Sequence, residues 1–212
     1  MKKITIIFIS ALFTLTTSAF AGGMIGVKLG VGDLEGNKKG YTAGTNAYGA
    51  SSGSKDAEFG AIFAEVNVND SPISVGLEYV PFDADISLNG QNNTVHANVD
   101  DYTTIYALAM HELDEVNLYA KLGYSMADIG TVTPNDSATT VDSQSSELEG
   151  IMYGVGVQSK ELLPFGIVAR AEYTFTEFDD ISVTTTSLGS SSVKKTASGD
   201  LTTLTISLAK SF

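Results

Sequence analysis

The sequence of 212 residues contains no cysteine, which excludes both a disulfide framework and any thiolate metal site. It contains only two histidines and therefore no histidine cluster for a transition metal. Only 12 basic residues stand against 25 acidic ones, and this acidic excess argues against nucleic-acid binding, which needs a basic face. Charged residues make up 17% of the chain, below the roughly 25% of soluble domains. The length suits one domain, and the many uncharged polar residues indicate a β protein with long polar loops.

Long apolar runs are also absent after Ala21, which excludes a membrane-spanning helix in the rest of the chain. The start of the chain has the three parts of a secretory signal: Lys2 and Lys3, the apolar stretch 4–15, and the small-x-small site 19–21. A membrane-anchoring helix is the alternative, but threonine and serine dilute the stretch and no charged flank follows it. We therefore predict that residues 1–21 are a cleavable signal peptide and that residues 22–212 form the exported domain.

Eight segments of this domain alternate in character at every second residue, which is the period of a β-strand. They cover residues 25–31, 62–68, 73–79, 102–110, 116–126, 151–157, 165–175 and 202–212. In the segment 116–126, for example, Leu118 and Leu122 fall on an apolar face and Lys121 on the other. In the segment 102–110 we assign Tyr106 and Leu108 to the apolar face, together with the residues that share their parity, which are Tyr102, Thr104 and Met110.

Alternation alone does not separate a soluble β fold from a membrane barrel, but the connections do. Three connections are short, at residues 69–72, 112–115 and 159–164, and four long ones, at 33–56, 83–100, 130–146 and 179–199, alternate with them. Short turns at one end and long loops at the other are typical of outer-membrane barrels, whereas a sandwich would have Greek-key crossings. We predict an all-β fold, an eight-stranded antiparallel up-and-down transmembrane β-barrel whose apolar face contacts lipid.

This register predicts the positions of aromatic and charged side chains. Several aromatics fall near strand ends and would form two girdles at the membrane interfaces, although strands favour aromatics in general. The predicted girdle consists of Tyr79, Tyr102, Tyr124, Phe165, Phe175 and Phe212. Charges fall on the inner face, where burial requires pairing. We expect contacts among Glu65, Glu78, Lys121, Arg170 and Glu172, with Lys28 balancing the charge. Such a network is either a plug, the usual state at eight strands, or a gate over a narrow pore.

The chain as a whole resembles the small eight-stranded outer-membrane barrels of the OmpA/OmpX kind. The resemblance rests on the signal peptide, the eight alternating strands, the alternation of short and long connections, and the C-terminal residues. The resemblance implies that a terminal Phe212, with Leu204, Ile206 and Leu208 before it, is the signal read by the barrel-assembly machinery. Lys210 departs from that pattern. It further implies location in the outer membrane of a Gram-negative bacterium, with lipid, lipopolysaccharide, periplasmic chaperones and an unknown extracellular ligand as partners.

The sequence predicts no catalytic residue, no cofactor and no metal site. We expect a structural or surface-interaction role with a side-chain-filled lumen; a narrow pore is the alternative, and a lipid A-modifying enzyme ranks below it. An enzyme would need His96 with Asp100 or Asp101, since His111 lies at the turn end of its strand. The third long loop is acidic and would be either a solvated surface or a divalent-cation site. Its carboxylates are Asp128, Asp136, Asp142, Glu147 and Glu149.

Overall fold

The structure is a computed structural model that describes residues 22–43, 45–69, 71–81, 84–89, 94–131, 133–134, 139–162, 166–187 and 192–212. Eight long strands dominate it: β1 (Gly23–Lys38), β4 (Ser51–Asn67), β5 (Ile73–Val80), β7 (Thr94–Glu112), β8 (Val116–Ile129), β11 (Glu147–Ser159), β12 (Ile167–Ser187) and β13 (Val193–Ser211). The shorter strands are β2 (Tyr41–Ala43), β3 (Asn46–Tyr48), β6 (Ala84–Asn89), β9 (Thr133–Pro134) and β10 (Thr139–Gln144). Within the described ranges there is no helix that has the length and apolar character to cross a membrane.

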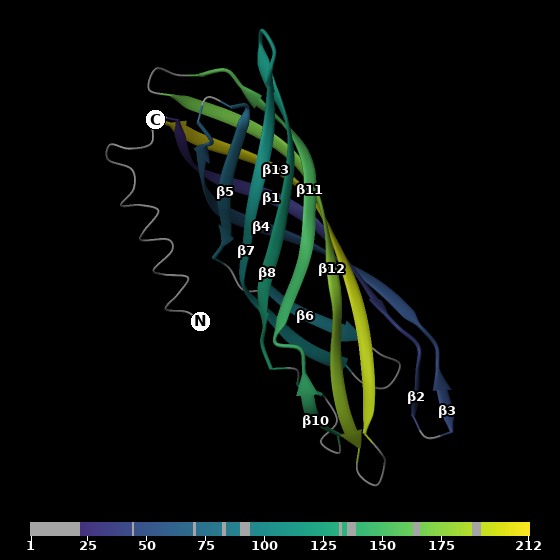
Figure 1. Cartoon of the computed structure of the whole chain (residues 1–212). Coiled ribbons are helices and arrows are strands. Elements are labelled where there is room, and N and C mark those ends of the chain that lie inside the picture. Colours follow the sequence, from purple (N-terminus) through teal and green to yellow (C-terminus); the bar gives the residue numbers. More distant parts are fainter. Residues whose placement is uncertain are drawn as a thin grey trace.

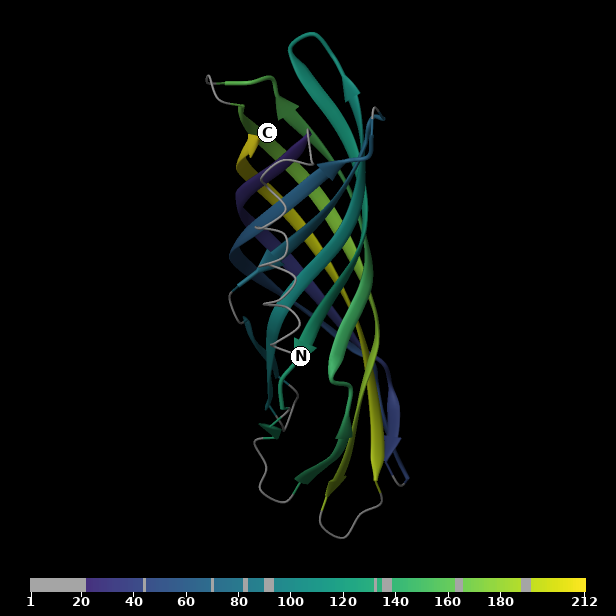
Figure 2. The same cartoon turned by 60° about the vertical axis from the view of Figure 1, so that its left-hand side comes forward.

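The eight long strands form a closed antiparallel ring (Figures 1 and 2). Each long strand after β1 pairs with the long strand that precedes it in the chain. The last strand, β13, also pairs with β1, which closes the ring. Closure leaves no unpaired edge within the ring, which a strand-built membrane protein requires because lipid offers no hydrogen-bond partners. The prediction of an eight-stranded up-and-down barrel is confirmed.

The two ends of the barrel differ, as Figure 1 shows. At one end the strands are joined by the short turns, and the Gly22 amide donates to the Phe212 carbonyl at 3.0 Å, so that both ends of the described chain meet there. At the other end the strands run on far beyond the ring. In outer-membrane barrels the short-turn end faces the periplasm and the long end faces outward.

The prediction that the four long connections are loops is wrong over much of their length. The β1–β4 ladder continues to the pair Lys38 and Ser51, and the β12–β13 ladder continues to Thr185 and Val193. Strands β6 and β10 lie within the other two connections. The physical reason is that no lipid contacts these segments, so their strands carry no apolar face and the alternation signal disappears although the backbone pairing persists.

The lipid-facing register is confirmed for seven of the eight strands. The side chains predicted to face lipid are exposed, with Ile206 at 64% and Leu122 at 62%, whereas Arg170 on the opposite face is 6% exposed. An apolar band of this kind costs free energy in water, about 25 cal/mol for each Å² left exposed, and is stable only against hydrocarbon.

The register predicted for the segment 102–110, now within β7, is wrong. Tyr106 and Leu108 are 3% and 1% exposed inside the barrel, and Ile105 faces outward at 55%. The reason lies in the partners: the Tyr106 hydroxyl reaches a lumen carboxylate, and Leu108 packs with Tyr119 and Met152. Small alanines suffice on the lipid side of this strand. A bulge between Asp100 and Thr103 marks the outer limit of this register.

Inward glycines make room for the inward aromatic rings. Each of three aromatic residues lies directly across a ladder from a glycine, and a Cβ on that glycine would come within 2.5 Å of the ring. The pairs are Phe63 with Gly26, Tyr106 with Gly76, and Tyr119 with Gly156. A glycine inside a strand often marks such a close approach.

Candidate functional site

The centre of the lumen holds six buried charged side chains from five strands. Alternation points each of them inward, and three acids face three bases. They are Lys28 on β1, Glu65 on β4, Glu78 on β5, Lys121 on β8, and Arg170 and Glu172 on β12. The structure therefore brings together all five residues proposed from the sequence, and Lys28, expected to balance their charge, lies among them.

Four of the six form an alternating square. The Lys28 ammonium donates to Glu78 at 2.6 Å and to Glu172 at 2.7 Å, and the Lys121 ammonium donates to the same two oxygens at 3.0 and 3.1 Å. Each carboxylate thus receives two ammonium groups, and each ammonium contacts two carboxylates. Lys121 also lies 3.9 Å from the centre of the Tyr106 ring, a cation–π contact.

The remaining two residues, Arg170 and Glu65, form a bidentate salt bridge, with N–O distances of 2.6 and 2.7 Å. The arginine Nε donates to Gln158 at 2.7 Å, and the Tyr106 hydroxyl donates to Glu65 at 2.7 Å. The planar guanidinium matches a carboxylate in this way, whereas a lysine would make a single contact.

The network matters because its members are so strongly desolvated. Removing one partner from a buried ion pair destabilises a protein by about 3–5 kcal/mol, since the other charge is left without compensation. Here the charges balance and hydrogen bonds satisfy the carboxylates. The space enclosed by Lys28, Phe63, Tyr106 and their neighbours has no room for a water molecule.

Sequence reasoning missed the two tyrosines of this network. Tyr106 was assigned to the wrong face, and Tyr119, whose hydroxyl donates to Glu172 at 3.1 Å, was not considered. The available signal was the set of inward glycines, because a glycine on one strand indicates a bulky neighbour on the next.

The aromatic residues proposed for the girdle do not share one environment. Tyr124 and Phe212 are exposed on the outer surface, and Phe175 contacts Tyr153 there, with ring centres 5.3 Å apart. The Tyr79 hydroxyl donates to Asp101 at 2.7 Å. Phe165 lies outside the described residues.

The assignment of Tyr102 to the girdle is wrong. Its hydroxyl donates to the buried Ser125 at 3.0 Å, and its ring meets the buried Phe178 edge-on. The cause is the register of β7, which turns Tyr102 inward together with Tyr106.

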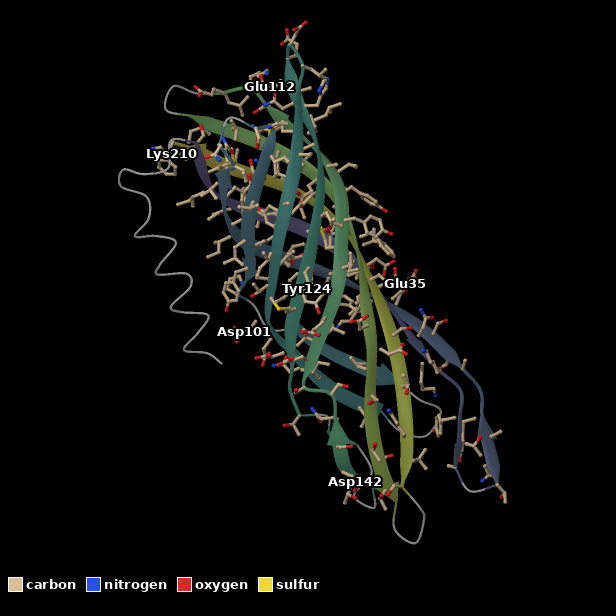
Figure 3. All side chains as sticks on the ribbon, viewed as in Figure 1. Glu35, Asp101, Glu112, Tyr124, Asp142 and Lys210 are labelled. Atoms are coloured by element: carbon tan, nitrogen blue, oxygen red, sulfur yellow. The ribbon has the colours of Figure 1, made fainter. Side chains whose placement is uncertain are left out.

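The C-terminal residues proposed as an assembly signal lie on the lipid-facing surface of β13 and just beyond it. Four of these side chains are more than half exposed: Leu204, Ile206, Leu208 and Phe212. Lys210 lies between them in sequence, and its ammonium is 5.3 Å from the centre of the Phe212 ring. Figure 3 shows Lys210 at the short-turn end of the barrel, where an ammonium reaches water.

The acidic residues of the third long connection are spread over several elements. Asp128 and Glu147 face each other across the β8–β11 ladder, and Asp142, labelled at the outer end in Figure 3, accepts a hydrogen bond from Thr186 at 2.6 Å. Asp136 lies outside the described residues, and Glu149 follows Glu147 on β11. In the part of the chain that the structure describes, no three potential metal ligands converge.

The histidines lie at different places along β7. His111 is exposed beside Glu112, which Figure 3 shows at the short-turn end. The backbone of His96 pairs with Ser87 and Thr133 in the outer extension.

The fold agrees with a family comparison. The profile of the outer membrane protein beta-barrel domain matches residues 6–192. The chain belongs to this family. As a member of the outer membrane protein beta-barrel family, it resides in the outer membrane of a Gram-negative bacterium.

The chain is similar to solved outer-membrane protein structures at low sequence identity. Outer membrane protein AlkL, solved in DMPC bilayers, is 13% identical, with 93% of each chain covered and a TM-score of 0.52. Neisserial surface protein A is 11% identical, with 92% of this chain and 100% of that chain covered and a TM-score of 0.48. Ail, the attachment invasion locus protein of Yersinia pestis, is 13% identical, with 90% and 99% covered and a TM-score of 0.44. No curated protein matches the sequence.

Proposed function

We propose that this outer-membrane barrel is a non-conducting scaffold that presents its long outer hairpins for structural or surface interactions. The single observation that carries the proposal is the filled lumen, in which six balanced charges and three aromatic rings leave no space for water at the centre. We also infer that residues 1–21 are removed as a signal peptide; in support, Gly22 already takes part in the closing hydrogen bonds of the barrel.

The energetics of the network support a plug over an open pore. An ion crossing the lumen would have to separate Lys28 or Lys121 from both carboxylates of the square. Each such separation leaves buried charge uncompensated, at a cost of about 3–5 kcal/mol. A lumen held by several cross-strand ion pairs also ties β1, β5, β8 and β12 together, which favours a rigid support for the hairpins.

Single-channel recording in planar bilayers tests the proposal. We expect no steady conductance from the wild-type barrel, because the pocket lined by the network has no space for a water molecule. Steady conductance that disappears in Glu78→Gln or Arg170→Met, but persists in the outer-hairpin variant Tyr48→Ala, would establish the pore instead. Analysis of lipid A from cells with and without the protein covers the enzymatic alternative: a modification lost in His96→Ala would overturn the scaffold role.

A further inference from the structure

The basic residues of the outer extensions gather on two hairpins that the barrel closure brings side by side. The β1–β4 hairpin and the β12–β13 hairpin lie next to each other through the β1–β13 ladder, which runs to the pair Lys38 and Ala197. The Lys39 amide then donates to the Thr196 carbonyl at 2.9 Å. On the described parts of these hairpins the lysines are Lys38, Lys39, Lys55, Lys194 and Lys195.

Two of these lysines converge on one aromatic ring. The ammonium groups of Lys38 and Lys195 each lie 5.5 Å from the centre of the Tyr41 ring. Tyr41 in turn stacks on Tyr48, with ring centres 4.8 Å apart and planes within 10°. Tyr48 is 46% exposed, so the stack presents a flat aromatic surface to the outside. We call these four residues the tyrosine–lysine cluster.

Within the described ranges, the ammonium groups of Lys38 and Lys195 differ from the lumen lysines in having no acidic partner. Among the described residues, no ion pair involves Lys38 or Lys195, whereas Lys39 is paired with Asp180. Burial, and then repulsion from Lys38, lower the pKa of Lys195. Like charges held together without a counterion are an unfavourable arrangement that a bound anion would relieve.

The position of the cluster indicates the kind of anion. Lys38 is seven residues beyond Val31, the last exposed apolar residue of β1. At about 3.3 Å per residue and a tilt of about 40°, the cluster stands roughly 15–20 Å above the apolar band. Membrane phosphates next to the hydrocarbon lie well below it, so an anion from outside the membrane fits better.

The charges around the cluster are compatible with an acidic glycan. Glu35 and Asp200 face each other three residues closer to the membrane, about 10 Å along the strands and beyond the Debye length of about 8 Å at physiological salt. A nucleic acid needs a broad basic face, and 25 acidic residues against 12 basic ones argue against such a face. An acidic glycan carries sulfate or carboxylate groups that accept charge-assisted hydrogen bonds from ammonium groups, and an exposed tyrosine offers a flat apolar surface for a sugar ring.

We propose that the tyrosine–lysine cluster binds an anionic glycan outside the cell, with a sulfate or carboxylate group between Lys38 and Lys195 and a sugar ring on Tyr48. This inference rests on the surface-interaction role proposed above and names its ligand class. The β1–β13 ladder holds Lys38 opposite Ala197, and the β12–β13 ladder holds Lys195 opposite Val183, so the backbone of both lysines is pre-organised.

The test measures binding of dextran sulfate to the full barrel in detergent micelles at 0.15 M salt, with uncharged dextran beside it. We expect dextran sulfate to bind and dextran not to bind. The double variant Lys38→Gln/Lys195→Gln should weaken binding about tenfold, since charged hydrogen bonds are lost. Lys194→Gln is the matched control for the single variant Lys195→Gln, since each removes one charge, from neighbouring residues on opposite faces of the strand; only Lys195→Gln should weaken binding.

Three results would overturn the proposal. They are absence of dextran sulfate binding, an equal loss in Lys194→Gln and Lys195→Gln, and loss of dextran sulfate binding when lipopolysaccharide is added to the micelles, which would assign the site to membrane phosphates. Unchanged heat-dependent gel mobility shows that each variant is folded. The binding assay does not depend on conductance. A failure of glycan binding therefore leaves the scaffold proposal intact, and a failure of the scaffold proposal would show in the single-channel recordings instead.

Discussion

At the scale of single residues, the lumen is governed by pairing across strands. Arg170 and Glu65 come from β12 and β4, and their bond is one of the contacts that cross the interior directly. Tyr106 shows the same dependence, since its orientation follows from Glu65 and from Gly76 on the next strand. The inward side chains therefore depend on one another, and replacing one leaves its partners without a hydrogen bond or a counter-charge.

Replacing Arg170 by methionine should destabilise the barrel by about 3–5 kcal/mol, because Glu65 is left buried without its cation. The double variant Arg170→Met/Glu65→Met should recover most of that loss, since neither charge remains. Urea unfolding in phospholipid vesicles measures both free energies. A double variant no more stable than Arg170→Met would show that the pair acts through packing and not through charge.

At the scale of the strand, β7 shows how alternation can be misread. Both of its faces contain residues that lipid tolerates, and the larger apolar set, including Tyr106 and Leu108, lies inside. The other strands carry an unambiguous inner face because glycine, a charged residue, serine or threonine occupies it. Composition alone thus orients a strand only when its polar face cannot enter hydrocarbon.

Single-cysteine labelling tests the orientation of β7. The sequence contains no native cysteine, so only the introduced residue reacts. A membrane-confined maleimide should modify Ile105→Cys readily and Leu108→Cys several-fold less, because Ile105 faces outward and Leu108 is buried. Leu122→Cys on β8 is the positive control, being 62% exposed. Labelling of Leu108→Cys at the rate of Leu122→Cys would contradict the register described here.

At the scale of the whole molecule, closure between the first and last strands creates the barrel and the tyrosine–lysine cluster together. The β1–β13 ladder runs from the periplasmic end, at Met24 and Ser211, to the outer end at Lys38 and Ala197. Assembly of the last strand is therefore expected to decide whether the chain becomes a barrel at all.

We expect Phe212→Ala to reduce the amount of assembled barrel in the outer membrane several-fold, because it removes the last residue of the proposed assembly signal. Leu113→Ala is the control, since Leu113 is an exposed apolar residue in a periplasmic turn outside that signal. Heat-dependent gel mobility of membrane fractions measures the assembled form. An equal loss of assembled barrel in both variants would contradict the role of Phe212 as part of an assembly signal.

The sequence alone determined the fold class, the number of strands and the outward face of seven of them. These features are local. A strand in lipid must show an apolar side chain at every second position, and this alternation is visible in a short stretch of sequence. The five lumen charges were found for the same reason, because a charge is excluded from the lipid face. The tertiary structure decided which charges pair, how β7 is turned, that the outer connections are paired strands, and that Lys38 meets Lys195 over Tyr41. Each of these depends on residues far apart in the chain, and only closure of the ring brings them into contact.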